Sequence, residues 1–173
     1  MPNRLVIWVE GDRDQRFFES VIKPRLAPMY DQVLVREYRQ RKTPAFNKLL
    51  IAMPHQGFGR LFIADMNSAP CVTGRKTRLR ERHHALNDDE IVIVSKEIES
   101  WYLAGLTAEG KSALKISLPN ATDRLTKEDL EALRPRRFDS QLDFLIELLK
   151  YFDITTACSR NQSFAYFCRK LGL

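Results

Sequence analysis

Oxygen-bearing side chains follow several of the apolar segments that could form buried strands in this chain. Glu10 follows the run 5–9, Asp65 follows the run 61–64, and Asn67 stands two residues beyond Asp65. Because ligands of parallel sheets bind outside the carboxyl ends of the strands, we expect these side chains to meet at one edge. Clustered carboxylates repel one another unless a hard cation such as Mg²⁺ or Mn²⁺ neutralises them. The pattern therefore predicts a metal site suited to phosphoryl chemistry.

A further acidic pair, Glu97 and Glu99, follows the apolar run 91–94 in a segment that we expect to begin a helix. On a helix these two side chains lie about 200° apart, so at most one of them should face a cation directly. Either is a candidate metal ligand. Lys96, beside them, is a candidate for steadying negative charge on a phosphate.

A basic segment comes soon after Asp65, with five Lys or Arg residues against one Glu between residues 75 and 82. If the segment is helical, Arg75, Arg78 and Arg82 share one face and could track a phosphate backbone. The nucleic-acid contacts that we expect are Arg75, Lys76, Arg78 and Arg82. The alternative is a solvated helix face paired with acidic neighbours. A second basic group supports the interpretation as a nucleic-acid-binding surface. It comprises Arg36, Arg39, Arg41 and Lys42.

His83 and His84 end this segment. Adjacent residues of a helix point about 100° apart, which argues against joint binding of a metal. The sequence favours neither histidine as a catalytic base.

Strand and helix patterns alternate through the first part of the chain. Strands are predicted at 5–9, 33–35, 61–64 and 91–94. The segments between them have helical patterns, with Pro24 marking the end of the first helix, Thr43 capping the second and the basic helix running to about Leu86. This order predicts an α/β fold with a four-stranded, mostly parallel sheet and helices on both faces, through about residue 105.

After Gly105 only helical patterns remain, including a capping box at Thr126 and Asp129 and the amphipathic stretch 142–149. Residues 106–173 are too few for an independent core. We therefore expect a core of residues 1–105 with a helical C-terminal extension packed on it, as one domain. The aromatic side chains have the spacing of core residues, and they are Trp8, Phe144, Phe152, Phe164, Tyr166 and Phe167.

The composition is that of one globular domain, with 173 residues, 44% hydrophobic and 29% charged. The net charge of +6 favours polyanionic partners. The three cysteines have no metal-binding spacing, so we expect reduced thiols. No apolar run approaches the roughly 20 residues that cross a bilayer, which leads us to expect a cytoplasmic protein without a membrane partner.

The run Val9-Glu10-Gly11 with Asp14, Phe17 and Phe18, followed by Asp65-Met66-Asn67 after a strand, resembles the Toprim fold of topoisomerases, bacterial primases and OLD-family nucleases. The segment 97–104 is similar to the Glu-x-Trp helix of small stand-alone Toprim proteins related to the OLD nucleases. The resemblance covers roughly residues 4 to 105. It implies a Rossmann-like sheet that holds Mg²⁺ between Glu10 and an Asp-x-Asp motif, matched here by Asp65 and Asn67, and it favours Glu99 over Glu97.

Asn67 departs from the family pattern, because it offers a carbonyl oxygen without negative charge. Metal affinity should be weaker, or Glu97 and Glu99 must contribute. Topoisomerase and primase activities need further domains that this chain does not hold.

The function that we expect is a Mg²⁺- or Mn²⁺-dependent nuclease, or a related phosphotransfer enzyme, acting on DNA or RNA. Its expected catalytic residues are Glu10, Asp65, Lys96 and Glu99. The alternatives are a non-catalytic Toprim-like module that binds nucleic acid or a partner protein, and a nucleotide-binding regulator. The sequence leaves the oligomeric state open.

Overall fold

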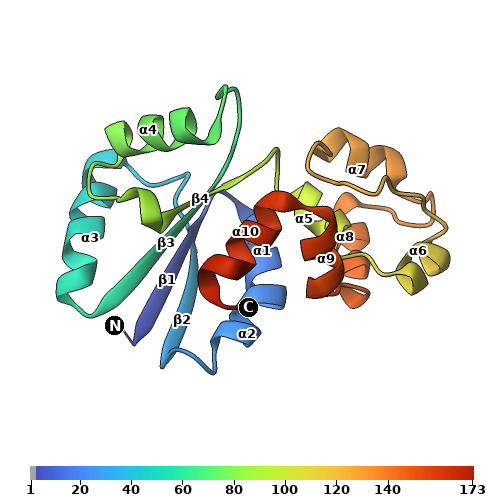
Figure 1. Cartoon of the computed structure of the whole chain (residues 1–173), viewed down its shortest axis with the longest axis horizontal. Coiled ribbons are helices and arrows are strands. Elements are labelled where there is room, and N and C mark those ends of the chain that lie inside the picture. The colour runs from blue at the N-terminus through green and yellow to red at the C-terminus, as the bar shows by residue number, and fades with distance from the viewer. Residues whose placement is uncertain (1–2) are drawn as a thin grey trace. The chain divides into compact units, whose positions relative to one another are not determined.

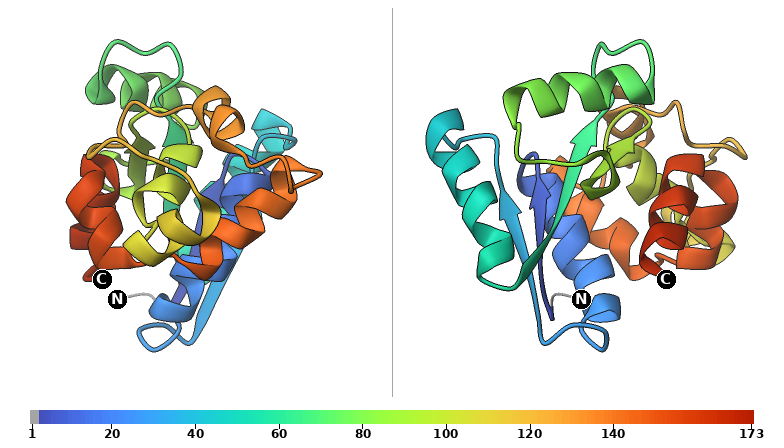
Figure 2. Two further views of the ribbon diagram at one scale, coloured as in Figure 1. Left: turned by 90° about the vertical axis from the view of Figure 1, so that its right-hand side faces the viewer. Right: turned by 60° about the vertical axis from the view of Figure 1, so that its left-hand side comes forward.

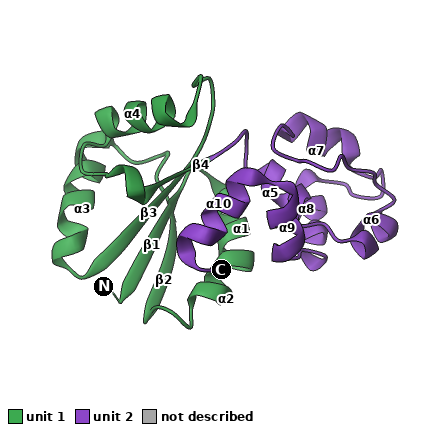
Figure 3. Ribbon diagram, in the orientation of Figure 1, with its two compact units in different colours: residues 1–93 green, residues 94–173 purple. Residues whose placement is uncertain are grey.

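The computed structural model describes residues 3–173, and the chain divides into two compact units at residues 93 and 94 (Figure 3). Each unit is described by itself. The expectation of a single domain with a boundary at residue 105 remains a prediction.

The sheet has four parallel strands in the order β2-β1-β3-β4 (Figure 1). Its strands are β1 (Arg4–Val9), β2 (Gln32–Glu37), β3 (Phe58–Asp65) and β4 (Ile91–Val94). The predicted α/β fold and the four predicted strands are confirmed. Strand β1 is central because its apolar run is buried from Leu5 to Val9, and it pairs in parallel with both β2 and β3.

Helices cover both faces of this sheet (Figure 2). Helix α3 (Thr43–His55) packs Phe46, Leu50 and Met53 against Trp8 and Phe62 of the sheet. The opposite face carries the helical run of α1 (Asp12–Phe17), a π-helical turn (Phe18–Ile22) and α2 (Lys23–Leu26). Helix α4 (Val72–Arg82) follows β3, and a short 3₁₀ turn (Asp88–Glu90) precedes β4.

The first helical run continues past Pro24, so the predicted end at this residue is wrong. Pro24 lies in the first turn of α2, directly after the π-helical turn. A proline is tolerated there because its missing N–H falls where the regular hydrogen-bond ladder is already interrupted.

Strand β3 begins at Phe58, three residues before its predicted start. The prediction missed these residues because the buried Arg60 interrupts the apolar run. Nε and a terminal nitrogen of Arg60 donate to the two carboxylate oxygens of Glu90, both at 2.8 Å. Such a bidentate pair satisfies a charge that would otherwise oppose burial. A strand interrupted by a charge is not recognisable from an apolar run alone.

Helix α4 is attached to its surroundings near both ends. Nε of Arg75 donates to the carbonyl oxygen of Asp65 at 2.8 Å, and Nζ of Lys76 donates to the carbonyl oxygen of Asp88 at 2.6 Å. Arg80 forms an ion pair with the carboxylate of Asp88 at 3.0 Å. The helix ends at Arg82 rather than near Leu86, since the backbone of His83 leaves the helical conformation.

The second unit is helical, as predicted after Gly105, and its first helix is α5 (Glu99–Ala104). Trp101 of α5 is fully buried beside Phe164 and Phe167, and its Nε1 donates to Ser163 at 2.9 Å. The predicted capping box of Thr126 and Asp129 is confirmed. Tyr166 is 43% exposed, so its predicted core position is wrong. The remaining helices are α6 (Ala108–Leu114), α7 (Lys127–Leu133), α8 (Gln141–Lys150), α9 (Ile154–Arg160) and α10 (Gln162–Leu171).

The described cysteines are all free thiols, as expected. Within residues 3–173, every helix is too short or too polar to cross a membrane.

Candidate phosphate-binding site

The carboxyl edge of the sheet brings together residues that follow three neighbouring strands. Glu10 follows β1, Tyr38 follows β2, and Asp65 is the last residue of β3. The ladder extends beyond the strand ends, because the N–H of Tyr38 donates to the carbonyl oxygen of Val9 at 3.0 Å. The parallel pairing of β1 with both neighbours therefore places these side chains at one edge, as the sequence predicts for Glu10 and Asp65.

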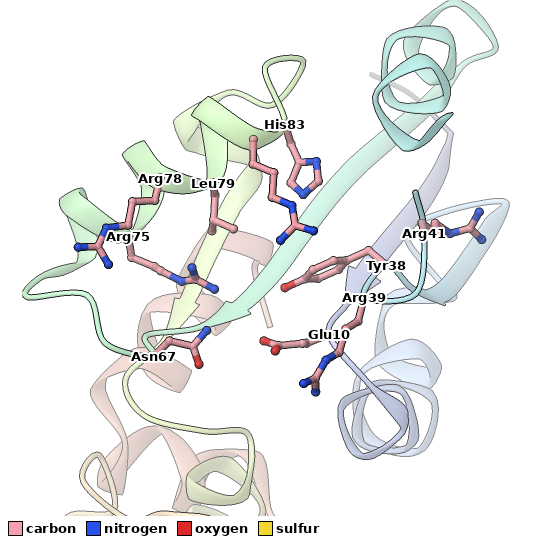
Figure 4. A pocket seen from close by; sticks show the side chains of 10 residues that line it. Glu10, Tyr38, Arg39, Arg41, Asn67, Arg75, Arg78, Leu79 and His83 are labelled. Atoms are coloured by element: carbon pink, nitrogen blue, oxygen red, sulfur yellow. The ribbon is translucent and has the colours of Figure 1, made fainter. Parts of the chain in front are cut away.

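A cavity of about 380 Å³ opens at this edge, a volume within the usual range for small-ligand sites. Figure 4 shows Glu10 and Asn67 on its floor, the Tyr38 ring on one wall and α4 on the other. Its lining residues are Glu10, Tyr38, Arg39, Arg41, Asn67, Arg75, Arg78, Leu79, Arg82 and His83. All of them belong to the first unit.

Five arginines line this cavity, and within residues 3–173 none of them forms an ion pair with a carboxylate. Arg75, Arg78 and Arg82 come from one face of α4, which confirms their predicted alignment. Arg39 and Arg41 come from the connection between β2 and α3. Guanidinium groups without acidic partners are suited to bind phosphate or carboxylate through paired N–H donors.

Two of the basic residues that the sequence singles out contact other parts of the protein instead of pointing into the cavity. Lys76 does not line the cavity, because its ammonium group donates to the carbonyl oxygen of Asp88. Arg41 points away from the cavity in Figure 4, with its guanidinium carbon 4.9 Å from the centre of the Trp8 ring. The remaining candidates for anion binding are Arg39, Arg75, Arg78 and Arg82.

Glu10 has the properties of a carboxylate that lacks a partner within the fold. Its Oε2 is buried and accepts no hydrogen bond from any of residues 3–173. In Figure 4 its side chain points toward Asn67 across the floor of the cavity. A buried carboxylate oxygen without a donor is costly, and a cation or a bound ligand would relieve that cost.

The acidic side chains at this edge suit Mg²⁺, which needs few protein ligands, better than a metal that is coordinated entirely by protein side chains. No three His, Cys, Asp or Glu side chains within residues 3–173 gather in a group that could hold a metal. Mg²⁺ keeps several waters and is often bound by one or two carboxylates together with phosphates of the substrate. Glu10 and the amide oxygen of Asn67 line the cavity and match that lower requirement. Asp65 is not among the lining residues, but its charge acts on the same Tyr38 hydroxyl as that of Glu10, so it could add a second carboxylate.

The backbone conformation at position 67 favours asparagine. Its φ is +50°, in the left-handed region that asparagine and aspartate enter more readily than other residues with a side chain. Asparagine therefore suits the turn between β3 and α4, and it gives the floor of the cavity less negative charge than an aspartate would.

The Tyr38 hydroxyl is buried among the charged groups of the site. Burial raises the pKa of its hydroxyl, and the negative charges of Glu10, Asp14 and Asp65 raise it further, against the opposing effect of Arg75. The hydroxyl is thus held as a neutral hydrogen-bond donor among carboxylates and a guanidinium. Sequence reasoning missed Tyr38, although its place directly after β2 was a usable signal.

His83 lies at the upper end of the cavity and is only 3% exposed. Burial lowers its pKa from 6.5 to about 4, helped by the positive charge of Arg82 and by His84. Its Nδ1 lies 3.1 Å from Oδ1 of Asn47 in α3. The imidazole is therefore neutral at pH 7 and fixed by a partner far away in the sequence.

The lowered pKa of His83 should make the protein less stable in mild acid. The unfolded chain takes up a proton near pH 6.5 whereas the folded chain does not until about pH 4, so stability is lost as the pH falls between these values. We expect the free energy of unfolding to drop by roughly 2 kcal/mol from this group between pH 7 and pH 5. Urea unfolding at both pH values measures it.

The matched variants are His83→Phe, which removes the buried imidazole, and His55→Gln, which removes an exposed one. The pH-dependent loss should shrink in His83→Phe and persist in His55→Gln. An undiminished loss in His83→Phe would show that other groups cause it.

The other predicted site residues belong to the second unit. Glu97 precedes α5 instead of lying within it, and its Oε2 accepts a hydrogen bond from the backbone N–H of Lys127 at 2.7 Å. The predicted helical separation of Glu97 and Glu99 is therefore wrong. Glu99 is buried in the first turn of α5, and Lys96 is exposed. Their roles as ligands or catalytic groups remain predictions.

Comparison of the chain with models of protein families, with curated proteins and with solved structures gives no match in any of the three.

Proposed function

We propose that the protein is a Mg²⁺-dependent nuclease of Toprim type, with the cavity at the carboxyl edge of the sheet as its active site. The observation that carries the proposal is the combination of Glu10, a carboxylate without a partner, with arginines that lack acidic partners in one cavity. The parallel sheet with acidic residues after β1 and at the end of β3 supports the Toprim resemblance.

Phosphodiester cleavage needs charge stabilisation and correct positioning of the phosphate. Arg75, Arg78 and Arg82 would bind the phosphate oxygens from α4, and Arg39 would approach from the opposite wall. Glu10 and Asp65 would hold Mg²⁺, which when bound polarises the phosphate and lowers the pKa of a bound water. The Tyr38 hydroxyl would donate a hydrogen bond to a phosphate oxygen, which its neutral state allows.

The test is incubation of labelled single- and double-stranded DNA and RNA with the protein and Mg²⁺ or Mn²⁺. We expect cleavage that stops when the metal is chelated, together with metal binding measured by calorimetry. Absence of both cleavage and metal binding would refute the proposal.

A non-catalytic module that binds nucleic acid is the second candidate. Asn67 favours it, since this residue replaces the second aspartate of the Toprim pattern. Binding of oligonucleotides without cleavage in either metal would select this candidate.

A further inference from the structure

The neighbours of His83 determine which of its two nitrogens carries the proton. Nδ2 of Asn47 donates to the carbonyl oxygen of Arg82 at 3.1 Å, which orients the amide, because a carbonyl can only accept. Oδ1 of Asn47 therefore faces Nδ1 of His83, at 3.1 Å. Since Oδ1 also only accepts, the proton lies on Nδ1, and Nε2 keeps its lone pair.

The surroundings of the ring hold it in place. Its centre lies 5.2 Å from that of Phe46, 5.6 Å from that of Phe62 and 6.4 Å from that of Tyr38. The ring points into the cavity in Figure 4, and within residues 3–173 its Nε2 has no hydrogen-bond partner. A fixed acceptor thus lies among arginines that can only donate.

We infer that Nε2 of His83 accepts a hydrogen bond from a ribose 2′-hydroxyl, so that the site takes RNA in preference to DNA. This inference rests on the proposed function, because the arginines must first hold the phosphate backbone in the cavity. A ligand that satisfies the whole cavity needs anionic oxygens for the arginines and a hydroxyl donor beside them. RNA offers both in every nucleotide, and the 2′-hydroxyl is the group by which proteins distinguish it from DNA.

A role as the general base fits the surroundings of His83 less well. A base is most effective when its pKa is close to the working pH. The buried imidazole, with Arg82 and His84 next to it, takes up a proton only at much lower pH. Such a group accepts a hydrogen bond without removing the proton.

The test compares four oligonucleotides of one sequence, single-stranded, with chelator present so that only binding is measured. They are RNA, DNA, 2′-fluoro RNA and 2′-O-methyl RNA. The two modified strands keep an RNA-like sugar and lack the hydroxyl donor. We expect RNA to bind about five- to tenfold more tightly than the other three, the value of one hydrogen bond in a site built to accept it.

His83→Phe keeps an aromatic ring and removes the acceptor, so it should reduce this preference to less than twofold while DNA binding persists. His55→Phe, which makes the same change at an exposed position outside the cavity lining, should keep the preference. The comparison of RNA with 2′-fluoro RNA on the unmodified protein needs no variant to fold.

Equal binding of RNA and 2′-fluoro RNA by the unmodified protein would overturn the inference and leave the proposed function standing. A preference that survives in a folded His83→Phe variant would also overturn it. Failure of all four strands to bind in chelator would overturn the inference, whereas the cleavage and metal-binding assays decide the proposed function separately.

Discussion

Replacement of Glu10 by glutamine should reduce metal-dependent cleavage at least about 100-fold while leaving the fold as stable as before or more stable. The loss follows because the amide has no negative charge for Mg²⁺, and the metal contributes several kcal/mol to the transition state. Nucleic-acid binding in chelator should be retained or strengthened, since a negative charge leaves a site for polyanions. Single-turnover cleavage and oligonucleotide affinity measure the two effects.

The expected gain in stability distinguishes a functional carboxylate from a structural one. Oε2 of Glu10 is buried without a donor among residues 3–173, and Glu10, Asp14 and Asp65 all act on the same Tyr38 hydroxyl. Removing one of these charges relieves repulsion, so the melting temperature should not fall. Mg²⁺ should raise the melting temperature of the unmodified protein and not that of Glu10→Gln.

Glu81→Gln provides the control, because it makes the same change at an exposed position of α4. It should leave cleavage and the effect of Mg²⁺ unchanged. Cleavage by Glu10→Gln at the rate of the unmodified protein would exclude Glu10 from the metal site.

Asn67→Asp adds a negative charge to the floor of the cavity, whereas Glu10→Gln removes one, and the same cleavage assay measures both. Aspartate tolerates the left-handed backbone at this position, so the variant adds a charge without new strain. We expect it to need less Mg²⁺ for half-maximal cleavage, because a carboxylate replaces an amide oxygen. An unchanged Mg²⁺ requirement would place Asn67 away from the metal.

Replacing Arg75, Arg78 and Arg82 together by glutamine should greatly weaken the binding of nucleic acid and make it less dependent on salt. Each phosphate contact contributes about 0.7 to 0.9 to the slope of log affinity against log salt concentration. Removing three contacts should therefore reduce the slope by about 2 to 3. Fluorescence anisotropy at several salt concentrations measures it.

Arg80→Gln is the matched control, since Arg80 lies on the same helix but forms an ion pair with Asp88. Its slope should stay close to that of the unmodified protein. Equal slopes for the triple variant and the unmodified protein would show that nucleic acid binds elsewhere.

Much of the first unit could be predicted because its signals are local. The apolar runs of β1 and β4 are short and continuous, and the parallel arrangement follows from the alternation of strands with helices. The arginines of α4 align because residues 75, 78 and 82 share a face of any helix. In each case the information lies within a few neighbouring residues.

The missed features depend on contacts between distant residues. Asn47 orients His83 across 36 positions, and the buried Arg60 side chain is satisfied by Glu90 and by the carbonyl oxygen of Leu50. The extra residues of β3 and the early end of α4 could not be read from periodicity for the same reason. Glu97 lies outside the helix that the sequence predicts to begin after the run 91–94, and its carboxylate accepts a hydrogen bond from the backbone N–H of Lys127, thirty residues away.

The attachment of α4 near both ends determines which forms of nucleic acid should fit the cavity. Arg75 is joined to the carbonyl oxygen of Asp65, and Lys76 and Arg80 are joined to Asp88, so the helix that carries the arginine face is held in place before any ligand arrives. Little backbone freedom is then lost on binding. Under the proposed function an incoming strand would have to adapt instead, and a nucleotide should enter a cavity of about 380 Å³ only when it is unstacked from its neighbours. Frayed ends, loops and single strands should therefore be bound before intact duplexes.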